Sequence, residues 1–318
     1  MRNRTLAMSG SRLSEAEGLS LEERVEKNPQ DVDSRLKLLG YYFRKQLEDP
    51  STKKAHEEHI VWLIQNKPEL DILATPFGIL YEKMNVSGYA RGRAAWLDQL
   101  KTDPENLKVL EHSAKYFMLF NPELAEELLL KGQVLDEKNP KWPAELGELN
   151  SLEMKKLSGE SAQSAAKKAL AQFEIAYRHS GEMGQDRLLD QLAEVALVAQ
   201  EYAKALEYAK IMLSRDDSHE NAGNNIHYGN ITLGKIAITA DDIEAAKQYL
   251  INAGKTSGSP PLNSFGPDMA LAKALLQEGA KETVLEYLTL CSKFWESGKD
   301  RLTNWLEMIQ NDQTPTDW

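Results

Sequence analysis

The sequence has little cysteine, no long apolar run and no excess of basic residues, and each deficit excludes a class of protein. Its one cysteine, Cys291, has no second cysteine with which to form a disulfide within the chain. No apolar run reaches the roughly 18 residues that a membrane-spanning helix needs. The 38 Lys and Arg residues against 49 Asp and Glu give a formal net charge of −11. We therefore expect no membrane span and no nucleic-acid partner, because phosphate binding depends on basic side chains.

Catalytic motifs are also missing. The sequence contains no HExxH, no CxxC, no glycine-rich phosphate loop and no Gly-x-Ser-x-Gly elbow. His56 and His59 are three residues apart on a predicted helix, a spacing that can hold a metal, but a zinc site needs further ligands. We therefore expect a packed or surface histidine pair, and we predict no metal site, no cofactor and no catalytic residue.

The sequence does have proline residues at regular intervals. Proline stops recur at intervals of 39, 36 and 36 residues, at Asn28-Pro29, Lys67-Pro68, Asp103-Pro104 and Asn139-Pro140. Proline at such a point ends one helix and favours the start of the next. This spacing predicts helical repeats rather than separate domains.

The clearest single repeat runs from Gly229 to Gly254. Leu233-Gly234 lies in its first helix, and Ala246 follows Gly234 by twelve residues in its second helix. The glycine lets the two helices approach closely, and the alanine is expected opposite it. This pattern resembles the tetratricopeptide repeat. The C-terminal part, from GNITLG to LNSFGPDMALAK, is similar to uncharacterised bacterial repeat proteins, which implies a bacterial source and no activity.

The same template fits the chain seven times. The small first-helix residues are Gly40, Gly78, Ser113, Gly147, Ala193, Gly234 and Ala272, and the second-helix residues are Ala55, Ala90, Ala125, Ala169, Ala205, Ala246 and, as the exception, Val284. The resemblance implies an all-α protein, a right-handed α-α superhelix of about seven helical hairpins with terminal capping helices. Such a solenoid builds a continuous core by stacking its repeats.

The expected organisation is one solenoid with loose ends. Residues 1–18 are polar and lack periodicity, which predicts disorder. The solenoid covers 19–310, with repeats at 29–139, a repeat with a long second helix at 140–181, repeats at 185–297, a cap at 301–310 and a tail at 311–318. Within it, Lys255–Pro267 has three prolines and two glycines, so we expect an ordered loop without a helix and with Phe265 buried.

The resemblance also implies a concave groove lined by the first helices. The candidate partner-binding residues are Lys37, Tyr41, Arg44, Ile72, Ile79, Leu107, Leu110, Phe117 and Lys141. This apolar stretch with basic residues at its border suits an amphipathic helix or an extended peptide. In this interpretation a charge at Phe117 is tolerated by the fold. The alternative is that these residues pack against the long fourth-repeat helix or a second copy of the chain, and a homo-oligomer stays open.

A polar cluster begins the sixth repeat. His227, Tyr228 and Asn230 precede the loop that contains Asn263 and Ser264. Either these side chains hold that loop in place, or they form a pocket for a small ligand or peptide. Together the observations favour a non-catalytic protein or peptide-binding scaffold, and the alternative is a small-molecule or enzymatic site near His227 and Asn230. The N-terminus has no apolar signal core, so we expect a cytoplasmic protein unless a signal peptide has been trimmed.

Overall fold

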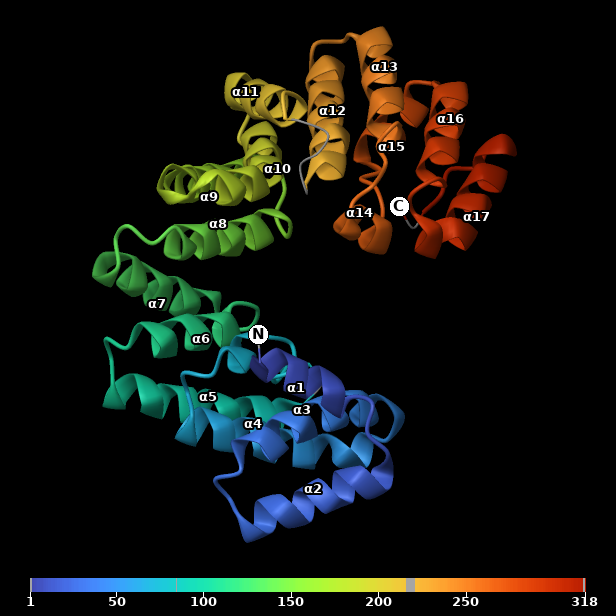
Figure 1. The fold of residues 1–318 in the computed structure, drawn as a ribbon. Helices are drawn as coiled ribbons and strands as arrows, with labels where there is room; N and C mark the ends of the chain where they lie inside the picture. Colours follow the sequence, from blue (N-terminus) through green and yellow to red (C-terminus); the bar gives the residue numbers. More distant parts are fainter. Residues whose placement is uncertain (1, 84, 216–220, 317) are drawn as a thin grey trace. The chain divides into compact units, whose positions relative to one another are not determined.

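The computed structural model describes residues 2–83, 85–215, 221–316 and 318, and every regular element among them is a helix (Figure 1). No helix in this described part combines the length and the apolar character that a membrane crossing requires. The chain divides into two compact units, Met1–Lys138 and Asn139–Trp318. Each unit is described by itself.

The N-terminal unit contains helices of the first three predicted repeats. Its elements are α1 (Arg2–Gly10), α2 (Glu15–Lys27), α3 (Val32–Glu48), η1 (Pro50–Thr52), α4 (Lys53–Asn66), η2 (Asp71–Ala74), α5 (Val86–Thr102), α6 (Leu107–Phe117) and α7 (Pro122–Leu135). Helix α3 packs on α4, and α6 packs on α7. Asn28, Lys67 and Asp103 are the C-caps of α2, α4 and α5. These three helices therefore end at the predicted proline stops, because the residue before a proline disfavours helical backbone.

The prediction that residues 1–18 are disordered is wrong for the described part of that segment, which excludes residue 1. Residues 2–10 form α1, which packs on α3, and α2 begins at Glu15 behind a Ser14 capping box. Ala7 of α1 is fully buried. A Cβ atom at Gly40 would collide with the Ala7 carbonyl, and one at Gly10 would collide with the Lys37 carbonyl. Small residues thus let the two backbones touch without an apolar stripe on α1.

The second predicted repeat lacks its first helix. Residues 71–74 form the short η2, and 75–83 contain turns and irregular backbone. Thr75 is extended, with φ −115° and ψ 165°, because Pro76 follows it. Gly78 therefore lies outside any helix, and Ala90 of α5 is exposed rather than packed against it. The proline inside the predicted helix overrides the repeat template.

The C-terminal unit consists mainly of paired helices. Its elements are α8 (Lys141–Met154), α9 (Gly159–His179), α10 (Glu182–Val198), α11 (Tyr202–Leu213), α12 (Ala222–Thr239), α13 (Ile243–Gly254), α14 (Pro260–Phe265), α15 (Ala270–Gln277), α16 (Lys281–Cys291), η3 (Glu296–Gly298) and α17 (Lys299–Gln310). Successive helices pack as the pairs α8 with α9, α10 with α11, α12 with α13 and α15 with α16. The long second helix of the fourth repeat is confirmed as α9.

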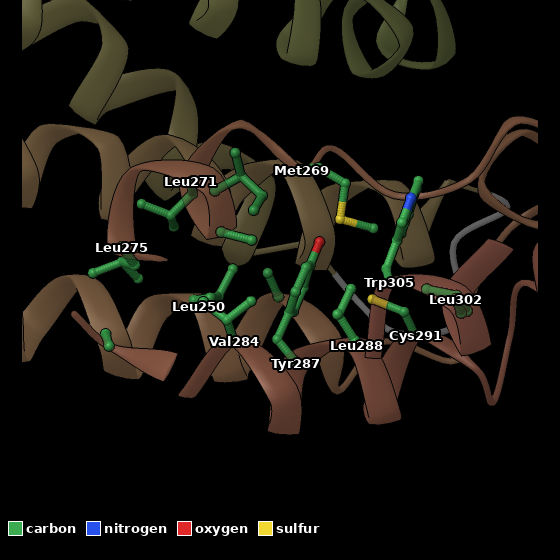
Figure 2. Packing of buried hydrophobic residues seen from close by; sticks show 14 of the residues in the cluster. Leu250, Met269, Leu271, Leu275, Val284, Tyr287, Leu288, Cys291, Leu302 and Trp305 are labelled. Carbon is green, nitrogen blue, oxygen red and sulfur yellow. The ribbon is translucent and has the colours of Figure 1, made fainter. Parts of the chain in front are cut away.

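A dense apolar core fills the end of this unit (Figure 2). Leu250, Leu271, Val284 and Tyr287 are fully buried and come from three different helices, α13, α15 and α16. Cys291 is also fully buried, and burial raises the pKa of its thiol to about 12. The core therefore supplies an inert thiol, as expected for a cysteine used as a small apolar residue.

The segment 255–267 differs from its prediction in two ways. Pro260–Phe265 form the short helix α14, with prolines at its first positions and the Ser259 hydroxyl capping the Leu262 N–H. Prolines fit there because the first helical N–H groups need no intrahelical partner. The prediction that Phe265 is buried is wrong, since Phe265 is 87% exposed while Leu262 is 1% exposed. The helical turn directs Leu262 into the core and Phe265 to solvent.

Candidate binding pocket

Four of the nine predicted groove residues are part of the core. Phe117 and Leu110 are fully buried, and Ile72 and Tyr41 are 1% and 5% exposed. The expectation that Leu110 and Phe117 tolerate a charge is therefore contradicted. Arg44 is exposed, whereas the remaining predicted residues are half-buried: Lys37, Ile79, Leu107 and Lys141. Lys141 begins α8 in the C-terminal unit.

Segments that the sequence did not place on this face cover it. The Tyr41 ring belongs to a cluster with Leu21 and Val25 of α2. In the same unit η2 packs against α6, the helix that carries Leu110 and Phe117. The spacing of residues along a helix defines a face, but it does not identify what packs against that face. The concave surface proposed from the template is therefore filled at these positions.

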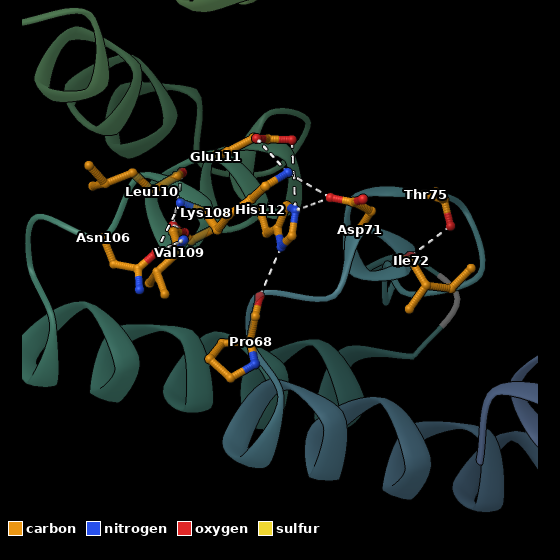
Figure 3. A network of polar contacts seen from close by, with 11 residues as sticks. Pro68, Asp71, Ile72, Thr75, Asn106, Lys108, Val109, Leu110, Glu111 and His112 are labelled. Atoms are coloured by element: carbon orange, nitrogen blue, oxygen red, sulfur yellow. Dashed lines mark hydrogen bonds and ion pairs between the residues drawn. The ribbon is translucent and has the colours of Figure 1, made fainter. Parts of the chain in front are cut away.

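A polar network fixes η2 to α6 (Figure 3). The His112 Nδ1 donates to the Pro68 carbonyl over 2.8 Å, and the Lys108 Nζ lies 2.6 Å from Asp71 Oδ1. Asn106 caps α6 by accepting from the backbone of Lys108. His112 is fully buried, and burial lowers its pKa. The network is structural, because its members join two elements of the fold.

The predicted polar cluster of the sixth repeat holds its neighbouring segment in place. His227 is fully buried, its Nδ1 donates to the Ala253 carbonyl over 3.2 Å, and its Nε2 accepts from the Asp268 N–H over 3.0 Å. The Asn230 amide donates to the Ile226 carbonyl of its own helix over 2.8 Å. Tyr228 is half-buried beside His227, with ring centroids 5.0 Å apart.

The other two members of that predicted cluster lie at the surface and do not take part in these hydrogen bonds. Asn263 and Ser264 are exposed, and the Ser264 hydroxyl donates to the Pro260 carbonyl within α14. The loop contact is made instead by Asn224, whose Oδ1 accepts from the Ser259 hydroxyl, and by the Thr256 hydroxyl, which donates to the Gly223 carbonyl over 3.0 Å. Direct hydrogen bonds therefore support the interpretation that polar side chains hold this segment in place.

His56 and His59 make separate contacts and do not form a metal pair. The His59 Nε2 lies 2.9 Å from Glu22 Oε1, and its Nδ1 lies 3.2 Å from the Arg35 guanidinium. In the described part of the chain, no three His, Cys, Asp or Glu side chains are placed to hold a metal ion. His56 has a different surrounding, in a cavity of the N-terminal unit.

We call this cavity the anchor pocket. It has a volume of about 220 Å³ and lies where the second repeat lacks its first helix, with a mostly apolar lining: Phe43, Gln46, Leu47, Lys53, His56, Ile79, Leu80, Tyr81 and Asn85. Leu47 is 70% exposed at the pocket, whereas Leu80 is 5% exposed. Of the predicted groove residues, Ile79 lines this pocket. The signal that could have located it is Pro76, which excludes a helix that would otherwise continue through the site.

His56 lines the anchor pocket and has one buried ring nitrogen without a partner among the described residues. The residue is 2% exposed, and its ring hydrogen-bonds to the Phe77 backbone in a way that raises its pKa, which identifies the ring as the donor to the carbonyl. Burial nevertheless dominates and lowers the His56 pKa to about 4. The Nε2 atom has no hydrogen-bond partner among the described residues. The ring is therefore neutral, and its Nε2 is a buried acceptor.

A second depression adjoins the anchor pocket, and we call it the cationic groove. It has a volume of about 370 Å³, and it shares Lys53 and Asn85 with the pocket, within the lining Pro50, Ser51, Lys53, Lys54, Glu57, Asn85, Ser87 and Arg91. Glu57 lies 2.6 Å from the Arg91 guanidinium and accepts from the Asn85 amide over 3.0 Å. The lining thus contains one carboxylate and three cationic side chains, of which Lys54 also lies 4.0 Å from the Glu58 carboxylate on the same helix.

No protein-family model matches the chain, and no curated protein sequence matches it either. The function of the chain is therefore inferred from its own residues and from the geometry described above.

Proposed function

We propose that the chain is a non-catalytic, tetratricopeptide-like scaffold with a right-handed superhelical repeat path, and that its N-terminal unit binds an acidic extended segment of a partner protein. The repeated helix pairs and the buried second-helix alanines support the repeat interpretation, since Ala125, Ala169, Ala205 and Ala246 are all fully buried. The observation that carries the binding proposal is the anchor pocket, which opens where one repeat lacks a helix.

The size of the anchor pocket favours a single side chain as its occupant. Its volume of about 220 Å³ exceeds the roughly 150 Å³ of a cavity that binds benzene. It is smaller than the roughly 300 Å³ at which pockets for drug-sized ligands begin. One large side chain of a partner fits these limits, and such buried anchors dominate the affinity of many interfaces.

The charge of the adjoining surface favours an acidic partner. The cationic groove includes Lys53, Lys54 and Arg91 against the single carboxylate of Glu57, on a chain whose net charge is −11. A locally positive surface attracts acidic residues and orients them during binding. The proposed ligand therefore has acidic residues next to its apolar anchor.

The alternative site at His227 and Asn230 has less support. Both ring nitrogens of His227 and the amide nitrogen of Asn230 already bond to protein atoms. A ligand there would have to replace these hydrogen bonds, which a buried polar group cannot lose without cost.

Selection from a displayed library of random peptides tests the proposal. The full chain should enrich peptides with a large apolar residue beside Asp or Glu, and their binding should weaken at high salt, because exposed charge pairs are screened. Leu47→Glu should abolish this binding with an unchanged melting temperature, since Leu47 is 70% exposed in the pocket lining.

The matched control for that variant is Leu19→Glu. Leu19 lies on α2 in the same unit and is 60% exposed, but it does not line the pocket. Binding should therefore survive this substitution. Enrichment of no common peptide, or equal binding by the Leu47→Glu and Leu19→Glu variants, would show that the anchor pocket is not the binding site.

A further inference from the structure

The cationic groove contains a guanidinium that the fold holds in place. The Arg91 side chain is 50% exposed in the lining, and its Nη1 donates to Glu57 Oε1 over 2.6 Å. Glu57 is 4% exposed, and its second oxygen accepts from the Asn85 amide over 3.0 Å. Asn85 is itself fixed, because its Oδ1 accepts from the Gly88 N–H over 2.8 Å. A buried and fully bonded carboxylate thus orients Arg91, as a supporting shell orients the residues of a binding site.

Two further cations give the lining an excess of positive charge. Lys53 and Lys54 are the first residues of α4, and the three cations less the one carboxylate leave a formal charge of +2. Two other carboxylates lie nearby but outside the lining. Glu58 forms an exposed pair with Lys54 at 4.0 Å, which holds that lysine weakly, and Asp49 accepts from the N–H and the hydroxyl of Ser51. The charge of the lining therefore matches a dianion better than a monoanion.

The start of α5 adds to this positive charge. Asn85 is the N-cap of this 17-residue helix, and Ser87 lies in its first turn; both residues line the groove. The aligned peptide dipoles of a helix place about half a positive charge at its N-terminus, where phosphate groups often bind. The cationic side chains and the end of the helix thus favour the same kind of ligand.

We propose that the cationic groove binds a phosphorylated serine or threonine of the partner segment, next to the apolar residue that enters the anchor pocket. This inference rests on the proposed binding function and names the chemistry of the acidic residue. A phosphate monoester carries a charge of about −1.5 to −2 at pH 7, whereas an aspartate or glutamate carries one negative charge. Lysine and arginine are common phosphate ligands. Lys53 and Asn85 line both depressions, so two neighbouring residues of one segment can fill them together.

Three N-acetylated tripeptides test this inference on the full-length chain. The phosphate probe has phosphoserine between two phenylalanines. The sulfate probe carries a sulfate ester instead, which has the same shape and a single negative charge, and the glycine probe replaces both phenylalanines of the phosphate probe by glycine. The phosphate probe should bind at least about 5-fold more tightly than the sulfate probe, as Coulomb's law gives for one additional unit charge about 4 Å from a cation in water. It should also bind more tightly than the glycine probe and shift the amide resonances of Lys54 and Ser87.

A pair of lysine variants locates the bound phosphate. Lys54→Gln removes one cation of the groove, and it should weaken binding of the phosphate probe about 5-fold and reduce its advantage over the sulfate probe. Lys101→Gln is the matched control. Lys101 is exposed on α5 and pairs with Asp98 of its own helix, as Lys54 pairs with Glu58, but it does not line the groove. Binding of both probes should be unchanged in this control.

The outcomes distinguish the phosphate preference from the binding function itself. Equal binding of the phosphate and sulfate probes, both tighter than the glycine probe, would overturn the phosphate preference and keep the anchor pocket. Equal binding of the phosphate and glycine probes, both tighter than the sulfate probe, would keep the phosphate site and overturn the anchor pocket. Inorganic phosphate that shifts the Lys54 and Ser87 amides with the affinity of the phosphate probe would show a site for the free ion instead of a partner. Binding of none of the probes by the folded chain would overturn both proposals.

Discussion

At the residue scale, buried imidazoles link the stability of this protein to pH. Burial lowers the pKa of both His56 and His227 from 6.5 to about 4, and it lowers the pKa of His112 as well. Each ring is neutral in the folded state at a pH where the unfolded chain already binds a proton. The free energy of unfolding therefore rises with pH across this interval.

The first prediction is that His227→Gln weakens this pH dependence. The stabilisation from a neutral His227 is complete above about pH 6.5 and is lost as the pH falls toward about 4. Its removal should reduce the slope by up to about 1.4 kcal/mol per pH unit. Urea unfolding at several pH values between these limits measures the slope.

Two comparisons make that measurement specific. His179→Gln is the matched control, because His179 is exposed and its substitution should leave the slope unchanged. Asp190 acts in the opposite direction, since burial raises its pKa to about 6 and its contribution therefore grows as the pH falls. Identical slopes in the His227 variant and in the wild-type chain would refute the linkage.

The second prediction is that Phe117→Glu unfolds the N-terminal unit. Phe117 is fully buried, with its ring centroid 5.5 Å from that of Tyr116. Loss of the ring alone should cost about 3–5 kcal/mol, and an unpaired buried carboxylate adds to this cost. Thermal unfolding followed by circular dichroism measures this loss of stability. Val134→Glu on α7 is the control, because Val134 is 72% exposed. Equal melting temperatures for the two variants would show that Phe117 is not a buried core residue.

At the element scale, the sequence predicts helices well where local signals and packing agree. The proline stops locate the ends of α2, α4 and α5, and the alanine-rich stretch predicts the long α9. The prediction of the second repeat is wrong because Pro76 breaks a helix that the spacing of small residues favours. Helix α1 escapes detection because its association depends on close backbone contact at Gly40, which has no hydrophobic period.

The third prediction follows from this contact between α1 and α3. Gly40→Ala places a Cβ atom where the Ala7 carbonyl lies, so α1 should separate from α3. Amide hydrogen exchange should then increase in residues 2–10, and protease should cleave there more readily. Gly181→Ala is the control, because a Cβ at Gly181 would meet nothing within 4 Å. Unchanged protection of residues 2–10 in the Gly40 variant would contradict the packing.

At the scale of the whole molecule, the candidate site was less predictable than the helices. The template identified Ile79 as part of a groove, and this residue lines the anchor pocket. It also placed Tyr41 and Leu110 in the groove, but α2 covers Tyr41, and Leu110 lies in the core. A repeat pattern describes one helix pair at a time, whereas a pocket depends on segments that depart from the pattern. His56 was recognised in the sequence, but the pocket that it lines also needs Leu80 and Tyr81 of the irregular segment.

The last prediction concerns the two units, Met1–Lys138 and Asn139–Trp318. The C-terminal unit has its own apolar clusters, centred on residues such as Phe173, Leu189 and Tyr287. A fragment of residues 139–318 keeps every helix pair of that unit intact, so it should fold alone and unfold cooperatively in urea. A control fragment of 169–318 begins inside α9 and lacks α8, which exposes the Phe173 side of that cluster. It should unfold at lower urea concentration, and an unfolded 139–318 fragment would show that this unit needs the first 138 residues to fold.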